Sequence, residues 1–167
     1  MHLGLKYSVT FSGEFMGYTD ASWGDVGDRH STSGVVFLSV GSPIVWFSKR
    51  QTTVALSTTE SEYIALFEAV KEAVWLRQLY ADIGQTDVGP TILNVDNTSA
   101  NAIANNSKSS KRLKHMDIKY HYVREVVSDG AVATSYCPTN VMLADILTKP
   151  LARARFEELR NKLGLVM

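Results

Sequence analysis

The feature that most constrains the fold is a long amphipathic segment at residues 60–83. Apolar side chains, Tyr63 and Val70 among them, recur there at helical spacing, which predicts one long helix. Helix N-cap residue types precede it at residues 57–59, and Gly84 follows it as a C-cap candidate. A helix placed between strands must pack against the sheet that those strands form.

The rest of the chain supplies those strands. β-branched and aromatic runs bounded by turn residues predict strands at residues 16–22, 34–40, 44–48, 91–95 and 131–137. Further helices are expected at 98–104, 116–127 and, in two pieces broken at Pro150, 141–163. The order is a β-hairpin followed by alternating helices and strands, which indicates a mixed sheet with helices packed on it. Residues 3–7 could add a short strand to the lead-in at residues 1–15.

Composition excludes several classes of protein. A length of 167 residues favours one domain with a substantial core. The single cysteine, Cys137, cannot form an internal disulfide, so we expect a reducing compartment. No apolar run is long enough for a bilayer, and no membrane partner is expected. The 17 basic and 17 acidic residues balance, so any contact with nucleic acid would depend on where the charges lie.

Four acidic residues stand where predicted strands end or predicted helices begin. Asp20 lies on the strand at residues 16–22, and Asp96 directly follows the strand that ends at Val95. Glu62 lies in the first turn of the long helix, and Asp145 near the start of the C-terminal helical tail. Because the long helix can be the crossover between two parallel strands, we expect Asp20 and Asp96 side by side, with Glu62 within reach.

Such a set of carboxylates is typical of a site for hard divalent cations. Crowded carboxylates repel one another and raise one another's pKa. Oxygen ligands without His or Cys favour Mg²⁺ or Mn²⁺. Two such ions about 4 Å apart can clamp a phosphate for in-line displacement and lower the pKa of the attacking water. The acids therefore predict metal-dependent chemistry at a phosphate.

Each acid also has an ordinary structural interpretation. The two aspartates beside strands could each simply begin a turn. Thr59-x-x-Glu62 matches a capping box, in which the carboxylate accepts a backbone N–H. Asn140 could cap the last helix and leave Asp145 on the exposed surface. Spacing alone leaves these alternatives open.

Six longer segments stand in order along the chain. They are GYTDA (17–21), DRHSTSG (28–34), VALSTTESEYIA (54–65), VDN (95–97), KHMDIKYH (114–121) and ADILTKPL (144–151). Together they resemble the ribonuclease H domain of copia-type LTR retrotransposon polyproteins, and the resemblance covers nearly the whole chain. It implies a ribonuclease H-like α/β fold at residues 16–167, with a five-stranded mixed sheet and helices on both faces.

The same resemblance implies an activity and its setting. The chain would be an endonuclease that hydrolyses the RNA strand of RNA–DNA hybrids during reverse transcription, with two Mg²⁺ ions that Mn²⁺ can replace. Its partners would be the hybrid and the reverse transcriptase region of the same polyprotein, in cytoplasmic virus-like particles. The isolated domain is expected to be monomeric. Two alternatives are a non-catalytic module that binds hybrids or tethers the polyprotein, and a related two-metal nuclease or integrase acting on DNA.

Residue by residue, the family's catalytic metal ligands fall on Asp20, Glu62, Asp96 and Asp145. Glu62 is preferred to Glu60 because EYIAL, which begins at Glu62, resembles the Glu-x-x-Ala phrase of ribonucleases H. Glu60 could then act in the helix cap. Many relatives carry a His-bearing loop before the last aspartate, whereas residues 138–143 contain no His.

Substrate contacts are predicted from two groups of residues. The basic group, in or beside an Asn/Ser-rich stretch, consists of Lys108, Lys111, Arg112, Lys114 and His115. Its lysines and arginine suit salt-sensitive phosphate contacts, although a solvated charge run or a helix-start histidine would look the same. The polar group that flanks the acids consists of Ser31, Thr32, Ser57 and Asn97. These side chains could read the RNA 2′-hydroxyl, or could be turn and cap residues. Trp46, Trp75 and Tyr63 are expected in the core.

Overall fold

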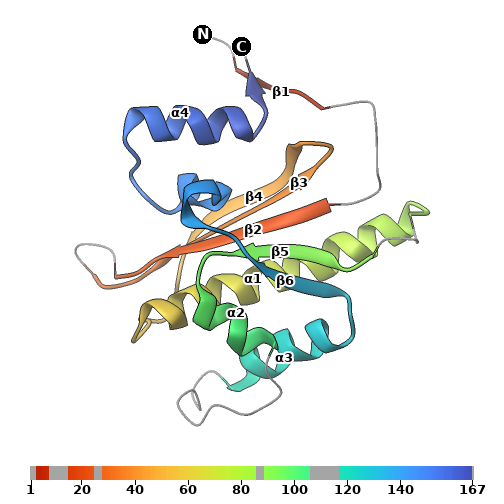
Figure 1. Ribbon diagram of the computed structural model, residues 1–167. Coiled ribbons are helices and arrows are strands. Elements are labelled where there is room, and N and C mark those ends of the chain that lie inside the picture. The colour runs from red at the N-terminus through yellow and green to blue at the C-terminus, as the bar shows by residue number, and fades with distance from the viewer. Residues whose placement is uncertain (1–2, 8–14, 25–27, 86–88, 106–116, 167) are drawn as a thin grey trace.

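The computed structural model describes residues 3–7, 15–24, 28–85, 89–105 and 117–166 (Figure 1). The main sheet consists of β2 (Phe15–Ser22), β3 (Thr32–Ser39), β4 (Ser42–Arg50), β5 (Thr91–Val95) and β6 (Val132–Tyr136). The helices are α1 (Thr58–Asp82), α2 (Thr98–Asn105), α3 (Asp117–Ser128) and α4 (Arg153–Lys162), with two 3₁₀ helices, η2 (Thr139–Val141) and η3 (Leu143–Leu147). Within these described ranges, no helix combines the length and the apolar character that crossing a membrane requires.

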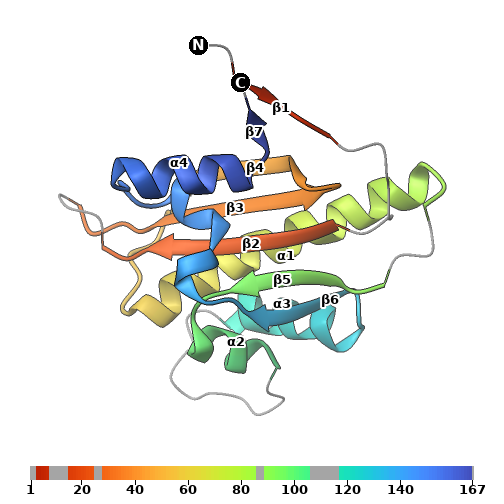
Figure 2. The same ribbon diagram turned by 45° about the horizontal axis from the view of Figure 1, so that its top comes forward.

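The sheet is mixed and has the strand order β4-β3-β2-β5-β6. β2, β3 and β4 form an antiparallel meander, whereas β5 lies parallel to β2 and β6 parallel to β5. Parallel neighbours need a crossover, and α1 provides it. Figure 2 shows α1 and α3 behind the sheet, whereas α4 packs on the opposite face. The expected α/β fold, with a five-stranded mixed sheet and helices on both faces, is confirmed.

The larger core fills the space between the sheet and α1. Leu66 of α1 is fully buried there with Val35 of β3 and Leu93 of β5. Tyr63 stacks on Tyr120 of α3, with ring centroids 4.1 Å apart. Successive strand residues point to opposite faces, so every second residue of β3 and β5 contributes to this core.

The smaller core lies on the opposite face, where α4 and η3 pack. It is formed by Val36, Leu143, Leu159 and Leu163. The tail is helical in pieces on either side of Pro150, as expected, but the first piece consists of the short 3₁₀ helices η2 and η3. Lys149 directly precedes Pro150, and the residue before a proline is disfavoured in the α conformation, so the first piece ends before Pro150. Short 3₁₀ turns are common connectors.

Two of the three aromatic residues expected in the core are exposed. Tyr63 is buried, but Trp46 is 55% exposed and Trp75 is 53% exposed. Trp46 lies on the edge strand β4, where it lines an apolar groove with Phe156 of α4. Trp75 lies beside Phe47 in a shallow surface depression. At the sheet edge, the layers that would cover these large side chains end.

A second, two-stranded sheet joins the two ends of the described chain. β1 (Gly4–Leu5) pairs antiparallel with β7 (Leu165–Val166), so the short strand expected within residues 3–7 is present. The Tyr7 hydroxyl donates to the Pro43 carbonyl at 2.6 Å and fastens this segment to β4. The division into a lead-in at residues 1–15 and a domain at 16–167 stays a prediction.

Candidate active site

Asp20 and Asp96 lie on adjacent parallel strands, at the same edge of the sheet. Thr19 of β2 lies opposite Val95 of β5, and the residues that follow these two are Asp20 and Asp96. Asp20 is completely buried, and Asp96 is partly exposed. Asp96 Oδ2 accepts a hydrogen bond from the Thr139 hydroxyl at 3.2 Å. The expected juxtaposition of the two strands is confirmed.

Helix α1 begins with a cap that leaves Glu62 available for another role. Ser57 Oγ accepts the Glu60 N–H at 3.2 Å, and Glu60 Oε2 accepts the Leu56 N–H at 2.8 Å. The capping box proposed for Thr59 and Glu62 is therefore wrong, because the helix cap lies two residues earlier. Among the described residues, the buried Oε2 of Glu62 has no hydrogen-bond partner.

Asp20, Glu62 and Asp96 form a compact group of carboxylates. One oxygen from each residue lies within 4.8 Å of the other two. Burial, followed by the charges of Asp20 and Asp96, raises the pKa of Glu62 to about 9. Burial and the charge of Asp20 also raise the pKa of Asp96. A bound cation would reverse both effects, and oxygen donors of this kind suit a hard divalent ion.

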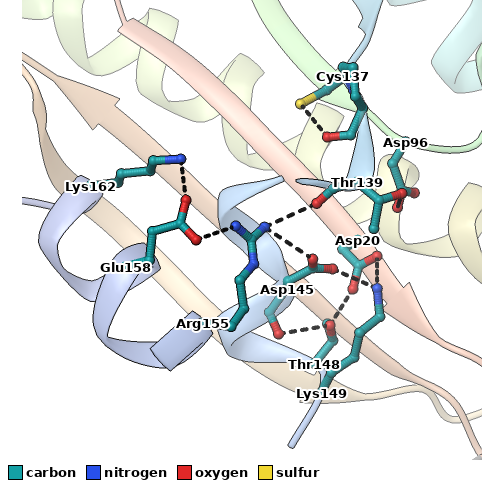
Figure 3. Close-up of polar contacts among 11 residues, drawn as sticks. Asp20, Asp96, Cys137, Thr139, Asp145, Thr148, Lys149, Arg155, Glu158 and Lys162 are labelled. Atoms are coloured by element: carbon teal, nitrogen blue, oxygen red, sulfur yellow. Dashed lines mark hydrogen bonds and ion pairs between the residues drawn. The ribbon is translucent and has the colours of Figure 1, made fainter. Parts of the chain in front are cut away.

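Asp145 lies on η3, which packs on the face of the sheet opposite to α1. Figure 3 shows its side chain near those of Asp20 and Lys149. Its Oδ1 lies 2.6 Å from Lys149 Nζ, and the same Nζ lies 3.0 Å from Asp20 Oδ1. Its Oδ2 lies 3.8 Å from the Arg155 guanidinium. Asp145 is buried, so the alternative that placed it on the exposed surface is wrong. Three of the predicted ligands are thus in one group, and the fourth joins Asp20 through Lys149.

Gly34 allows η3 to reach the acids. It lies directly opposite Asp20, on β3. A Cβ atom at this position would lie 2.6 Å from Thr148 Cγ2 and 3.1 Å from the Ala144 carbonyl oxygen. The Thr148 hydroxyl in turn donates to Asp20 Oδ2. Any side chain at position 34 would therefore push Asp145 away from the sheet.

The polar residues predicted to contact RNA have structural hydrogen bonds of their own. Ser31 is buried, and its hydroxyl accepts a backbone N–H at 3.3 Å. Asn97 Oδ1 accepts a backbone N–H at 2.9 Å in the first turn of α2, and Ser57 caps α1. Thr32 begins β3 and is partly exposed. A contact between any of them and RNA stays a prediction.

The basic group predicted to contact phosphate lies outside the described residues. It consists of Lys108, Lys111, Arg112, Lys114 and His115. Its role therefore also stays a prediction. The described part of the chain places two other cationic side chains, Lys149 and Arg155, directly beside the acids.

Sequence reasoning missed a line of alternating charges that links α4 to the acids (Figure 3). Lys162 Nζ lies 2.7 Å from a Glu158 oxygen, and the other Glu158 oxygen lies 3.0 Å from Arg155. Arg155 and Lys149 then flank Asp145. A signal for Lys149 was present, because it follows Asp145 at the four-residue spacing of helical neighbours. Arg155 carries no such local signal.

No family model matches the sequence. The chain is 40% identical over 150 residues to the retrovirus-related Pol polyprotein from transposon TNT 1-94 of Nicotiana tabacum, covering 89% of this chain and 11% of the relative. It is 36% identical over 149 residues to the retrovirus-related Pol polyprotein from transposon RE1 of Arabidopsis thaliana, covering 89% of this chain and 10% of the relative. The secreted RxLR effector protein 161 of Plasmopara viticola is 53% identical over 74 residues, or 44% of this chain and 52% of the relative. The chain thus spans about a tenth of the length of the Pol polyproteins that it matches.

Solved structures share the fold at low sequence identity. LC11-RNase H1, isolated from compost, matches with a TM-score of 0.62 and 15% identity over 81% of this chain and 93% of that one. The N-terminal RNase H domain of a Mycobacterium tuberculosis protein matches with a TM-score of 0.61 and 12% sequence identity, covering 89% of this chain and 96% of that one. LC11-RNase H1 in complex with an RNA/DNA hybrid matches with a TM-score of 0.60 and 14% sequence identity, covering 81% of this chain and 94% of that one. These similarities show a ribonuclease H-like fold.

Proposed function

We propose that this chain, a homologue of one segment of retrovirus-related Pol polyproteins from plant transposons, is a ribonuclease H that hydrolyses the RNA strand of RNA–DNA hybrids. The observation that carries the proposal is the group of Asp20, Glu62 and Asp96 at one edge of the sheet. LC11-RNase H1, which shares the fold, has been solved with such a hybrid. Hydrolysis would leave a 3′-hydroxyl and a 5′-phosphate.

The residues present fit divalent cations. A buried carboxylate oxygen without a hydrogen bond, such as Glu62 Oε2, is unfavourable, and a cation would satisfy it. Asp20, Glu62 and Asp96 would hold Mg²⁺, with Asp145 as the fourth ligand of a two-ion site. Mn²⁺ could replace Mg²⁺, because both ions accept oxygen ligands. When bound, the ions would activate a water molecule and neutralise charge on the phosphate.

The protein's own groups hold the acids in place and control their protons. Parallel strands fix Asp20 and Asp96 side by side, and hydroxyls of Thr148 and Thr139 donate to them. The pKa of Glu62, about 9, means that this carboxyl carries a proton at neutral pH when no cation is nearby. A metal ligand must be deprotonated, so cation binding would release that proton.

The substrate contacts and cellular setting follow from the proposed activity. Thr32, Ser57 and Asn97 would face the RNA, and the basic group at residues 108–115 would contact backbone phosphates. The partner in the polyprotein would be its reverse transcriptase region, and the setting a cytoplasmic virus-like particle.

Asp96→Asn tests the function directly. The amide keeps the size of the side chain but loses the charge that a metal ligand needs. Cleavage of a labelled RNA–DNA hybrid in Mg²⁺ should fall at least about a hundredfold, which corresponds to about 2.7 kcal/mol of barrier. Asp129→Asn, at an exposed residue beyond the end of α3, should cut like the unmodified protein. Circular dichroism would establish that both variants are folded.

Three results would point elsewhere. Undiminished cutting by Asp96→Asn would rule out the proposed site. A gel shift with the hybrid but no cutting in Mg²⁺ or Mn²⁺ would identify a non-catalytic binding module. Cutting of duplex DNA in preference to the hybrid would identify a nuclease or integrase that acts on DNA.

A further inference from the structure

Lys149 contacts two of the four acids at once. Its Nζ lies 3.0 Å from Asp20 Oδ1 and 2.6 Å from Asp145 Oδ1. Both carboxylates are buried, whereas 36% of the Lys149 side chain is exposed. An ammonium between two buried carboxylates offsets their mutual repulsion. This is also what a divalent cation does in a site built from carboxylates.

The fold places this ammonium. The backbone N–H groups of Thr148 and Lys149 both donate to the Asp145 carbonyl, at 3.2 Å and 3.1 Å. The Thr148 hydroxyl donates to Asp20 Oδ2, so two consecutive residues engage both oxygens of Asp20. The close approach of Gly34 to Thr148 holds this turn against β3.

The other two acids lack such a partner. Over the ranges that the structure describes, no ion pair joins Glu62 or Asp96 to a basic side chain. The acids are therefore divided into two halves. Glu62 and Asp96, together with Asp20, form the half that is open to a cation. The other half, which shares Asp20 and adds Asp145, already holds the ammonium of Lys149. Figure 3 shows Lys149 between Asp20 and Asp145.

We propose that Lys149 competes with the second divalent cation for Asp20 and Asp145, and that it sets the affinity of the site for that cation. This inference rests on the proposed function and adds a control of metal loading to it. The ammonium and the metal need the same oxygens, and like charges this close repel each other. Because its side chain is partly exposed and ends a flexible four-carbon stem, Lys149 can move into solvent when the metal arrives.

Competition predicts two unequal binding steps. The stronger step belongs to the half that is open, and the weaker step includes the displacement of Lys149. An ion pair with a purely structural role would instead leave metal affinity unchanged when it is removed. The direction of the change in affinity therefore separates the two roles.

The test is a calorimetric titration of MgCl₂ into the 167-residue chain after removal of metals with EDTA. In Lys149→Met the weaker step should become about tenfold tighter, a change of about 1.4 kcal/mol. Lys149→Arg keeps the positive charge and should retain the affinity of the unmodified protein. The control is Lys162→Met, because Lys162 also pairs with an acid four residues away but lies on α4. The affinity of the Lys162→Met variant for Mg²⁺ should equal that of the unmodified protein.

Thermal unfolding provides a second readout. Without metal, Lys149→Met should have a lower Tm than the unmodified protein, and Mg²⁺ should raise its Tm by more. Lys149→Gln serves the same purpose if the methionine variant does not fold. Unchanged or weaker Mg²⁺ binding in these variants, with clear binding by the unmodified protein, would overturn this inference alone. Absence of Mg²⁺ binding by the unmodified protein would overturn the proposed function as well.

Discussion

The two faces of the five-stranded sheet are built differently. The face under α1 is covered by a large apolar core that includes Tyr63 and Leu66. The face under α4 has a small apolar cluster and a line of alternating charges that runs from Lys162 to Asp20 (Figure 3). Three acids are thus presented by a tightly packed scaffold. The fourth, Asp145, comes from η3, which packs in the smaller apolar cluster, and its carboxylate pairs with Lys149 and Arg155.

The largest expected effect is a loss of stability from a substitution in the apolar core under α1. Leu66→Ala removes a fully buried side chain beneath α1 and should lower the free energy of unfolding by about 3–5 kcal/mol. Leu159→Ala, equally buried but in the smaller cluster under α4, should lower it by only about 2 kcal/mol. Urea denaturation measures both. Equal losses would show that the two faces contribute alike.

The next largest effect is a loss of stability confined to the face that carries η3. Gly34→Ala places a Cβ against Thr148 and Ala144 and should destabilise the protein by about 1–3 kcal/mol. Hydrogen exchange should accelerate at residues 143–149 and remain slow in α1. Gly4→Ala is the matched control, because a Cβ there meets no atom within 4 Å. Faster exchange throughout α1 would contradict a local effect.

A smaller effect concerns the edge where the faces meet. In EDTA, the folded protein keeps the Glu62 proton up to about pH 9, whereas the unfolded chain loses it near the ordinary value of 4.5. The folded state binds more protons between these values, so stability should fall as pH rises, by at most about 1.4 kcal/mol per pH unit. Glu62→Gln should flatten this dependence in denaturation measured from pH 5 to 8. An equally steep slope in the variant would assign it to other groups.

The smallest expected effect comes from removing a buried hydroxyl from the core under α1. The Tyr63 hydroxyl is buried and, within the described residues, has no hydrogen-bond partner. Tyr63→Phe removes it and keeps the ring that stacks on Tyr120. Stability should change by less than about 1 kcal/mol, in the favourable direction, because no hydrogen bond is lost. A clear loss in urea denaturation would reveal a partner for this hydroxyl.

Local patterns predicted the elements whose own residues determine them. The strand at Thr91–Val95 has the predicted bounds, and α1 differs from its prediction by two residues at its start and one at its end. Periodicity works there because apolar residues recur at the spacing of each element, although the start of α1 is buried on all sides from Glu60 to Leu66. The expectation that Trp46 and Trp75 are in the core was wrong, because it rested on their being large aromatic residues. Trp46 lies on the edge strand β4, and Trp75 lies on an exposed side of α1.

The grouping of the acids was predictable from the sequence, but their cationic partners were not. Strand order alone placed Asp20 beside Asp96, since parallel neighbours end at the same edge. The assignment of Glu60 to the helix cap is confirmed, whereas the alternative cap at Thr59 and Glu62 is wrong; spacing alone left both open, because residues 57–59 all have side chains that can cap. The role of Lys149 depends on how η3 packs against Gly34, which is a contact between distant parts of the chain.

The pairing of β1 with β7 has a consequence for assembly. Both ends of the described chain lie together at one side of the domain (Figure 2). A polypeptide continuing past both ends would enter and leave at one point, so the domain could be carried as a cassette within a longer chain. For the same reason, a circular permutant that joins the two ends with a short linker and opens the chain in an exposed turn should fold.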